Sequence, residues 1–356
     1  MAGDQSNGSV LDGLGAALAR RRGARTMMRG NDSTGTFDAR EHVLVIGLGR
    51  SGIASARVLR ARGASVIITD EKPPEALAAT IAELTTDAVR FVAPGAALRA
   101  ALGDVTACVL SPGVPLNGAL VREIQAARIP VYSEIEVAYR IGKAPIVAIT
   151  GTKGKTTTTA LVGEMFRRAG KTTHVGGNIG NALIDETFRA LPQDWVIAEV
   201  SSFQLESIRS FKPRIASILN LSPDHLDRYH SMDEYAEAKF RIFANQSATD
   251  TFVGNLDDPI VSTLAEGEFA KRIPSRARWF GLTPRRMTSL YVRNERITYA
   301  PPTGDPRPVE IMPVDEIPLL GRHNVSNVLA ALSIGLAADL DRDAMRAAVR
   351  EFKALP

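Results

Sequence analysis

The feature that most constrains this chain is a turn of small residues that directly follows a buried-strand pattern. The run Ile146-Val147-Ala148-Ile149-Thr150 is apolar and β-branched, and it leads into Gly151-Thr152-Lys153-Gly154-Lys155-Thr156-Thr157. The apolar residues Ala160-Leu161-Val162 then predict a helix. Strand, loop and helix in this order are typical of a phosphate-binding loop, because glycines let backbone N–H groups approach an anion and the helix N-terminus adds partial positive charge.

This loop predicts an ATP site. Lys155 is placed to bridge the terminal phosphates, and the hydroxyl of Thr156 is a ligand for Mg²⁺. The expected cofactor-binding residues are Gly151, Thr152, Lys153, Gly154, Lys155, Thr156 and Thr157. The spacing is the short Gly-x-x-Gly-Lys-Thr form, since Ile149 and not glycine stands five residues before Gly154. The simpler alternative is a glycine turn before an ordinary helix with an exposed lysine.

A second glycine-rich turn lies nearer the N-terminus. The predicted strand His42-Val43-Leu44-Val45-Ile46 is followed by Gly47-Leu48-Gly49-Arg50-Ser51-Gly52, and a strand over residues 65–69 ends at Asp70. This is the fingerprint of dinucleotide-binding sheets, and taken alone it favours an NAD-dependent oxidoreductase.

Three more strands complete the first predicted sheet, over residues 90–92, 107–110 and 130–132. The turn Ser111-Pro112-Gly113 closes the second of these at the carboxyl edge, where open α/β sheets bind ligands. We therefore expect a Rossmann-like nucleotide-binding domain over residues 41–135.

Polar residues follow two strands of the second predicted sheet. The strand over residues 195–198 leads into Glu199, and the strand over residues 215–219 leads to His225. Because the carboxyl ends of parallel strands share one edge, both side chains are expected beside the phosphate loop, where they suit a metal and phosphoryl site. The alternative is a solvated loop glutamate and a structural histidine. We expect residues 136–356 to form a P-loop ATPase-like domain with a mostly parallel sheet.

Lys239 lies within an apolar helical stripe. Ser231-Met232-Asp233-Glu234 has the form of a capping box, which predicts a helix start. The apolar face of that helix comprises Tyr235, Ala238, Ile242 and Phe243. Lys239 is either a lysine that extends to solvent from the edge of this face, or a buried amine. A buried amine loses basicity and can react with CO₂ to form a carbamate, which offers oxygen ligands to a metal.

The C-terminal part begins with a predicted hairpin, whose strands Ser289-Leu290-Tyr291-Val292 and Arg296-Ile297-Thr298-Tyr299 flank a short turn. Gly321 then opens a helix that extends to Ala337. Asn324 and Asn327 are three residues apart on one face of it, where their amides can read a base edge. The alternative for Asn324 is an N-cap.

Composition excludes several classes of protein. The chain has 356 residues, which suits two or three domains, and its apolar content of 45% and charged content of 23% are ordinary for a globular protein. A net charge of +4 gives little support for nucleic-acid binding. The single cysteine, Cys108, stands in an apolar run and fits a reducing compartment. We expect no membrane span, and we interpret residues 1–40 as a flexible leader or the result of a start site placed too early.

Six motifs occur in the order found in one family of enzymes. They are Gly151-Thr152-Lys153-Gly154-Lys155-Thr156-Thr157, Gly177-Asn178-Ile179-Gly180, Glu199-Val200-Ser201-Ser202-Phe203-Gln204-Leu205-Glu206, Asp224-His225-Leu226-Asp227-Arg228-Tyr229, Ala238-Lys239 and Gly321-Arg322-His323-Asn324-Val325-Ser326-Asn327. On these motifs the chain resembles the Mur ligases over residues 41–356. Its glycine-rich opening and Glu-Val-Ser-Ser-Phe-Gln-Leu string are most similar to those of the members that add D-glutamate.

The resemblance implies one cytoplasmic reaction of peptidoglycan synthesis. ATP phosphorylates the carboxylate of UDP-N-acetylmuramoyl-L-alanine, and the amine of D-glutamate attacks the acyl phosphate. ATP and Mg²⁺ are the implied cofactors, and the two substrates are the implied partners of a monomer. The alternatives are a Mur ligase that adds a different amino acid, an oxidoreductase, and a nucleotide-binding module without catalysis.

The resemblance also implies residue roles. Thr156 and Glu199 correspond to Mg²⁺ contacts, and His225 with carbamylated Lys239 to ligands of a second metal. Lys155, His225 and Lys239 are the implied catalytic residues. Asn178 corresponds to a substrate or phosphate contact, and Asn324 with Asn327 to the adenine side of the ATP site. The implied contacts of the uridine nucleotide, which takes the place of NAD, are Gly49, Arg50, Ser51, Asp70, Ser111, Pro112 and Gly113.

One departure from the family concerns the end of the chain. Mur ligases carry a third domain after the helix of the Asn324 motif, whereas this sequence stops at Leu355-Pro356. We therefore expect the third domain to be absent, and the two remaining domains to bind nucleotides with little or no ligation.

Overall fold

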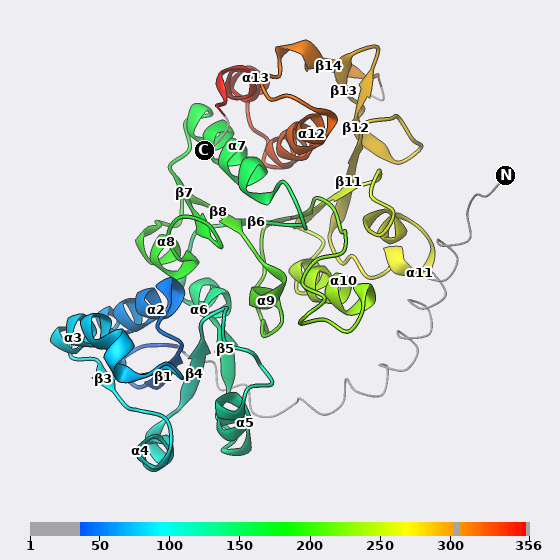
Figure 1. Ribbon diagram of the computed structural model, residues 1–356. Coiled ribbons are helices and arrows are strands. Elements are labelled where there is room, and N and C mark those ends of the chain that lie inside the picture. The colour runs from blue at the N-terminus through cyan, green and yellow to red at the C-terminus, as the bar shows by residue number, and fades with distance from the viewer. Residues whose placement is uncertain (1–35, 302–306, 354–356) are drawn as a thin grey trace.

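The computed structural model describes residues 36–301 and 307–353 and contains two sheets flanked by helices (Figure 1). The expected α/β class is confirmed. Of the leader expected over residues 1–40, residues 1–35 lie outside the described residues. Residues 354–356 lie outside them as well.

The first sheet is entirely parallel, with the strand order β3-β2-β1-β4-β5. Its strands are β1 (His42–Ile46), β2 (Ser65–Thr69), β3 (Arg90–Phe91), β4 (Ala107–Leu110) and β5 (Val131–Ser133). The helices of this part are α2 (Arg50–Ala61), α3 (Ala78–Thr86), α4 (Ala96–Ala101), α5 (Ala119–Ala126) and α6 (Glu134–Ile141), with short 3₁₀ helices at Pro74–Leu77 and Leu102–Asp104. Alternate residues of β1 face opposite layers, because side chains alternate along a strand. Val43 and Val45 belong to the core beneath α2, whereas Leu44 and Ile46 pack with α5.

The second sheet has nine strands in the order β14-β13-β12-β11-β10-β9-β6-β8-β7. Its strands are β6 (Ile146–Thr150), β7 (Thr173–Gly177), β8 (Trp195–Glu199), β9 (Ile215–Ile218), β10 (Thr251–Asn255), β11 (Arg276–Gly281), β12 (Thr288–Arg293), β13 (Arg296–Tyr299) and β14 (Val309–Pro313). Only the last two pairings are antiparallel, so the expectation of a mostly parallel sheet with a hairpin after residue 288 is confirmed.

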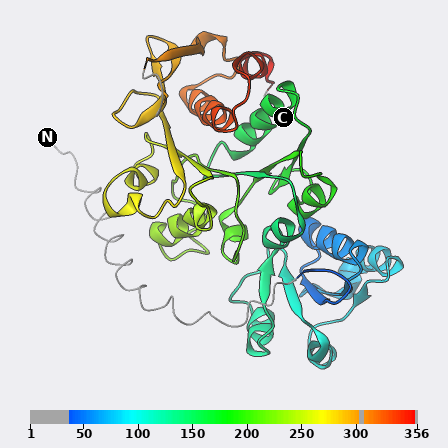
Figure 2. The same cartoon turned by 180° about the vertical axis from the view of Figure 1, so that it is seen from behind.

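Helices cover both faces of the second sheet (Figures 1 and 2). One face carries α7 (Lys155–Arg168), α12 (Arg322–Ala337) and α13 (Arg342–Glu351), and the other carries α8 (Leu183–Arg189), α9 (Ser202–Leu205), α10 (Met232–Phe240) and α11 (Gly267–Ala270). Short 3₁₀ helices lie at Arg241–Phe243, Val261–Ala265 and Val314–Glu316. Because both faces are covered, β6 is buried throughout, with Val147 and Ile149 packed toward α7 and Ile146 and Ala148 toward the other layer.

The two sheets share one hydrophobic core. Helix α8 of the second sheet packs against α2 and α6 of the first, and a single cluster of buried side chains continues from β1 through these three helices to β6 and β8. Residues 135 and 136, where we expected the domain boundary, lie inside α6. None of the helices in the described ranges combines the length and apolar character that a membrane crossing requires.

A buried carboxylate anchors α6 to the second sheet. The side chain of Glu136 accepts hydrogen bonds from the backbone N–H groups of Arg209 (2.9 Å), Ser210 (2.9 Å) and Phe211 (2.8 Å). Arg140, one turn further along α6, donates to it at 2.7 Å. Burial alone opposes ionisation, but the hydrogen bonds from Ser210, Arg209 and Arg140 outweigh it and hold the pKa of Glu136 below its ordinary value.

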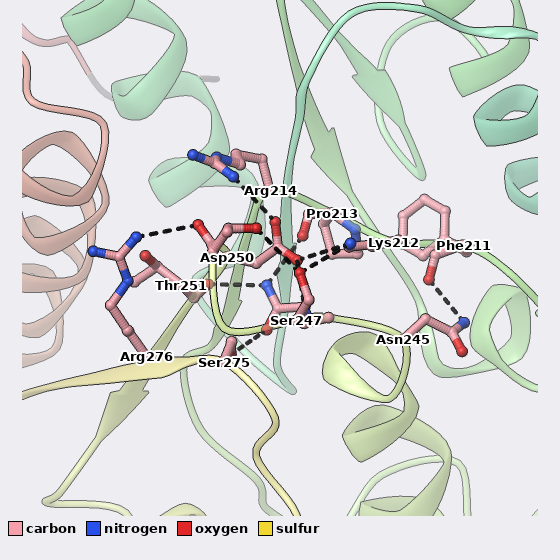
Figure 3. Close-up of polar contacts among 12 residues, drawn as sticks. Phe211, Lys212, Pro213, Arg214, Asn245, Ser247, Asp250, Thr251, Ser275 and Arg276 are labelled. Carbon is pink, nitrogen blue, oxygen red and sulfur yellow. Dashed lines mark hydrogen bonds and ion pairs between the residues drawn. The ribbon is translucent and has the colours of Figure 1, made fainter.

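A second polar network joins the amino ends of β9, β10 and β11, on the edge opposite the phosphate loop (Figure 3). Asp250 accepts hydrogen bonds from the backbone N–H of Ser247 (2.7 Å) and its hydroxyl (2.8 Å), and it pairs with Lys212 at 3.3 Å and Arg214 at 3.4 Å. These contacts satisfy backbone and charged groups where the strands begin.

We predict that Glu136→Ala lowers the free energy of unfolding by about 3 kcal/mol, because three backbone N–H groups and Arg140 lose their partner in a buried place. Glu136 has a lowered pKa in the folded state, so its contribution is present above the unfolded-state pKa and is lost as pH falls through the folded-state pKa. Urea unfolding between neutral and acid pH measures both effects. The surface variant Glu83→Ala, which removes one of the two exposed partners of Arg57, should change stability by less than about 1 kcal/mol.

Candidate active site

The carboxyl ends of three neighbouring parallel strands form the candidate site. β6 pairs with β8 on one side and β9 on the other, and the register places Ile149 beside both Glu199 and Ser217. The loops that leave these strands therefore start at the same edge. They carry the phosphate loop, Glu199 and His225, so the shared strand edge expected from the sequence is confirmed.

Glu199 is the centre of the hydrogen bonds in this site. Its side chain is buried, with 1% of the residue's surface exposed. One carboxylate oxygen accepts a hydrogen bond from the hydroxyl of Thr156 at 2.8 Å, and the other accepts from the amide of Asn178 at 2.8 Å. A hydroxyl and a carboxylate at hydrogen-bond distance are oxygen donors of the kind that Mg²⁺ prefers, so these two residues fit the metal that the sequence implies.

Two lysine side chains lie against the phosphate loop. Lys155 begins α7 and donates a hydrogen bond from Nζ to the carbonyl of Thr152 at 2.8 Å. Lys239 donates to the carbonyl of Gly151 at 3.0 Å and to Thr150 Oγ1 at 3.3 Å. Burial lowers the pKa of Lys155. Burial and then the nearby charge of Lys155 lower the pKa of Lys239 to about 7.

The helix that carries Lys239 begins as expected, with Ser231 as its N-cap accepting from the backbone N–H of Glu234 at 3.2 Å. The predicted capping box is only half formed, since the carboxylate of Glu234 accepts from the backbone N–H of His230 and not from that of Ser231. Lys239 is 2% exposed, so the alternative of a lysine reaching solvent is wrong.

Two residues that hold the phosphate loop were not predicted from the sequence. Asn220 accepts from the backbone N–H of Lys153 at 2.8 Å and donates to its carbonyl at 3.0 Å. The hydroxyl of Tyr235 lies 3.2 Å from that of Thr152. Asn220 closely follows a strand of the site, so the rule that identified Glu199 and His225 also applies to it, whereas the helical pattern places Tyr235 only on an apolar face.

His225 lies at the outer side of the site. Its backbone is left-handed, with φ of +54°, and 45% of its side chain is exposed. Its ring centroid lies 4.8 Å from that of Phe203 and 6.3 Å from that of Tyr235. The amine of Lys239 lies 4.8 Å from the Tyr235 ring centroid, so His225 and Lys239 both flank this tyrosine. Within the described residues, no three His, Cys, Asp or Glu side chains are grouped closely enough to hold a metal by themselves.

The candidate residues of the first sheet lie in two places. Arg50, Ser51, Ser111 and Pro112 line a cavity of about 260 Å³ together with Gly177, Asn178 and Gln204 of the second sheet. Arg50 also donates a hydrogen bond to the carbonyl of Asn178 at 3.1 Å.

Asp70 instead accepts hydrogen bonds from the backbone N–H groups of Leu48 (2.6 Å) and Lys72 (2.9 Å), so its carboxylate ties the glycine-rich turn to the end of β2. Neither Gly49 nor Gly113 lines the cavity, although Gly49 is the N-cap of α2.

Asn324 and Asn327 lie side by side on α12, where the amide of Asn327 donates to Asn324 Oδ1 at 3.1 Å. The N-cap of this helix is Gly321, and Asn324 is its third residue, so the alternative of an N-cap asparagine is wrong. Gly154 approaches Asn327 closely. A Cβ on Gly154, whose φ is +78°, would lie 2.2 Å from Asn327 Oδ1.

Fold and site together define an α/β protein built around a phosphate-binding loop. Residues 149–335 match the Mur ligase middle domain, and residues 41–133 match the Mur ligase MurD-like N-terminal domain. The chain belongs to the Mur ligase family, an ATP-dependent class of enzymes that form amide bonds. The resemblance found in the sequence motifs is thereby confirmed.

Among related proteins, the chain is 42% identical to the UDP-N-acetylmuramoylalanine–D-glutamate ligase of Koribacter versatilis over 316 residues, covering 88% of this chain and 68% of that enzyme. It is 41% identical to the enzyme of the same name from Pelotomaculum thermopropionicum over 317 residues, covering 88% of this chain and 67% of that one.

Solved structures share the fold at low sequence identity. The UDP-N-acetylmuramate:L-alanyl-gamma-D-glutamyl-meso-diaminopimelate ligase of Neisseria meningitides superposes with a TM-score of 0.58 at 17% identity, covering 89% of this chain and 99% of that one. The UDP-N-acetylmuramate-alanine ligase MurC of Thermotoga maritima gives a TM-score of 0.52 at 21% identity, covering 87% and 68%. These structures support the expected architecture of a Rossmann-like sheet followed by a phosphate-loop sheet.

We predict that Gly154→Ala weakens nucleotide binding at least about ten-fold, because the new methyl group displaces Asn327 and strains a left-handed residue at the start of α7. Gly170→Ala is the matched control, since Gly170 has a φ of +75° and no atom lies within 4 Å of the position that the methyl group would take. Both variants should lose about 1 kcal/mol of stability from backbone strain, but only Gly154→Ala should lose affinity. Titration with a fluorescent ADP analogue and thermal unfolding measure the two effects.

Proposed function

We propose that this protein ligates D-glutamate to UDP-N-acetylmuramoyl-L-alanine with consumption of ATP, in cytoplasmic peptidoglycan precursor synthesis. The observation that carries the proposal is the hydrogen-bonded group of Thr156, Glu199 and Asn178 beside the phosphate loop. Related proteins support the proposal, because the sequence of this chain is about 40% identical to those of enzymes named for this reaction.

The chemistry explains why such a site is needed. A carboxylate is a poor electrophile, so one of its oxygens first attacks the γ-phosphorus of ATP, and ADP leaves. The amine of D-glutamate then attacks the acyl carbon, the C–O bond breaks with its electron pair going to phosphate, and the amine loses a proton to give the amide. Both steps depend on positioning and on neutralising phosphate charge.

Residues of the phosphate loop fit this task. The backbone from Gly151 to Thr157 surrounds the phosphates, and Lys155 offers a cation that its contact with Thr152 already holds at the loop. Thr156 and Glu199 are the residues that would hold Mg²⁺, which when bound neutralises phosphate charge. Asn178 orients the Glu199 carboxylate from the opposite side.

We assign the uridine nucleotide to the first sheet, residues 41–135, and ATP to the second, residues 136–356. Arg50, Ser51, Ser111 and Pro112 face the cavity between them. A substrate whose nucleotide lies against the first sheet then extends toward Asn178 and the phosphate loop. Asp70 shapes the glycine-rich turn, while Gly49, at the start of α2, and Gly113 complete the proposed nucleotide contacts. Asn324 and Asn327 are assigned to the adenine side of ATP.

Lys239 and His225 form the remaining part of the proposed site. With a pKa of about 7, the Lys239 amine is substantially neutral at physiological pH and is able to add CO₂. The resulting carbamate would supply oxygen ligands beside His225 for a second metal. Without the carbamate the two residues offer an amine and an imidazole, which are poor ligands for Mg²⁺.

The first test is phosphate release from ATP. In a version of the protein that also carries the third domain of the family, we expect release to require both UDP-N-acetylmuramoyl-L-alanine and D-glutamate, and Lys239→Ala to reduce the rate at least about a hundred-fold. A screen of other amino acids separates the proposed enzyme from a Mur ligase of different specificity. Release that does not need the muramoyl substrate contradicts the proposal.

A second test concerns carbamylation. Because only the neutral amine reacts, the Lys239 carbamate should increase as pH rises through about 7, whereas an ordinary lysine stays protonated over this range. ¹³C NMR with labelled bicarbonate detects the adduct. Lys239→Arg keeps a cation without a reactive amine and should show no carbamate, and a signal of equal size in that variant places the modification elsewhere.

A further inference from the structure

The side chain of His225 has few neighbours at the edge of the site, which are the rings of Phe203 and Tyr235 and the carboxylate of Asp224. Its side chain is 45% exposed, so burial by itself does not fix the ring. Its backbone has a φ of +54°, a conformation that a non-glycine residue keeps only where neighbouring contacts enforce it. The carbonyl of His225 accepts from the backbone N–H groups of Arg228 (3.0 Å) and Tyr229 (3.1 Å), so the segment 225–229 forms a tight turn.

This turn is fastened to the segment that follows Glu199. Glu206, at the end of α9, accepts hydrogen bonds from the guanidinium of Arg228 at 2.6 Å and from the hydroxyl of Tyr229 at 2.6 Å. The Glu206 side chain is 15% exposed and that of Arg228 is 22% exposed, so water competes weakly for this pair. Burial and the bond to Glu206 raise the pKa of Tyr229, which therefore remains a donor.

An aromatic contact continues the connection to the imidazole. The Arg228 guanidinium carbon lies 4.1 Å from the ring centroid of Phe203, and the His225 ring lies 4.8 Å from the same ring. Phe203 and Glu206 both belong to the chain that leaves β8 after Glu199. The position of the His225 ring is thus set from the same segment as Glu199.

We propose that Glu206, with Arg228 and Tyr229, is a positioning group that holds the His225 imidazole at the edge of the phosphate site. The inference rests on the proposed function, in which His225 is a metal ligand. Glu206 acts by fixing the distance between the His225 turn and the end of β8.

The experiment observes the ring of His225 directly. The chain has five histidines, and ¹³C labelling of their Cε1 positions with a His225→Gln variant for assignment identifies the signal. Phe203 should shift this signal by its ring current. In Glu206→Gln and Glu206→Ala the shift should decrease toward that of an unstructured histidine. The control variant is Glu316→Ala. It removes a carboxylate that accepts two hydrogen bonds from the guanidinium of Arg350, at 2.8 and 2.7 Å, and it should leave the His225 signal unchanged.

The second measurement is broadening of the His225 signal by Mn²⁺ in the presence of a non-hydrolysable ATP analogue. We expect the Glu206 variants to need about ten-fold more Mn²⁺ than the parent protein, and the KM for ATP to change by less than about two-fold because the phosphate loop is intact. Thermal unfolding identifies a variant that fails to fold, in which case Glu206→Gln or Tyr229→Phe replaces Glu206→Ala.

The outcomes separate the two hypotheses. If His225 in the parent protein is not broadened by Mn²⁺, the metal role in the proposed function fails, while the ring-current shift still decides whether Glu206 positions the ring. If shift and broadening in both Glu206 variants equal those of the parent protein, the positioning role of Glu206 is overturned.

Discussion

The site depends on one buried carboxylate. Glu199 ends β8, is nearly inaccessible to solvent, and is bound by Thr156 on one side and Asn178 on the other. A polar group in such a place is tolerated only when its atoms are hydrogen-bonded, and here the partners come from the phosphate loop and from the segment after β7. A single side chain thereby fixes the relative positions of two loops that the strand order brings to one edge.

The segment after β7, which carries Asn178, also connects the site to the first sheet. Asn178 accepts a hydrogen bond on its carbonyl from Arg50, and both residues face the cavity between the sheets. Beneath this cavity α2, α6 and α8 share one apolar core, and Glu136 ties α6 to the chain around residue 210. The orientation of the two sheets is therefore set by packing and by a buried hydrogen-bond network, which suits a substrate that must reach from one sheet to the other.

Two amines close to one loop create an electrostatic conflict that the fold maintains. Lys155 and Lys239 both donate to carbonyls of residues 151–152, and the charge of one disfavours that of the other. Burial is the larger cause of the lowered pKa of Lys239 and the charge of Lys155 adds to it, so Lys239 has lost much of the basicity of a free lysine. A protein gains no stability from such an arrangement, and perturbed groups of this kind are concentrated at functional sites.

The sequence by itself determined the strands of the first sheet, the strands β6, β8 and β9 of the second, the two glycine-rich turns and the edge from which the loops of Glu199 and His225 start, because apolar runs and strand-end residues are local signals and parallel strands share an edge. Tertiary structure alone decided which partners those residues have. The helical pattern does not distinguish Tyr235 from a core residue, yet its hydroxyl lies beside Thr152, and Asn324 resembles an N-cap although Gly321 holds that place. Contacts such as Glu206 with Arg228 or Glu136 with residues 209–211 join segments far apart in the chain, and no periodicity or spacing encodes which distant side chain fills a given gap.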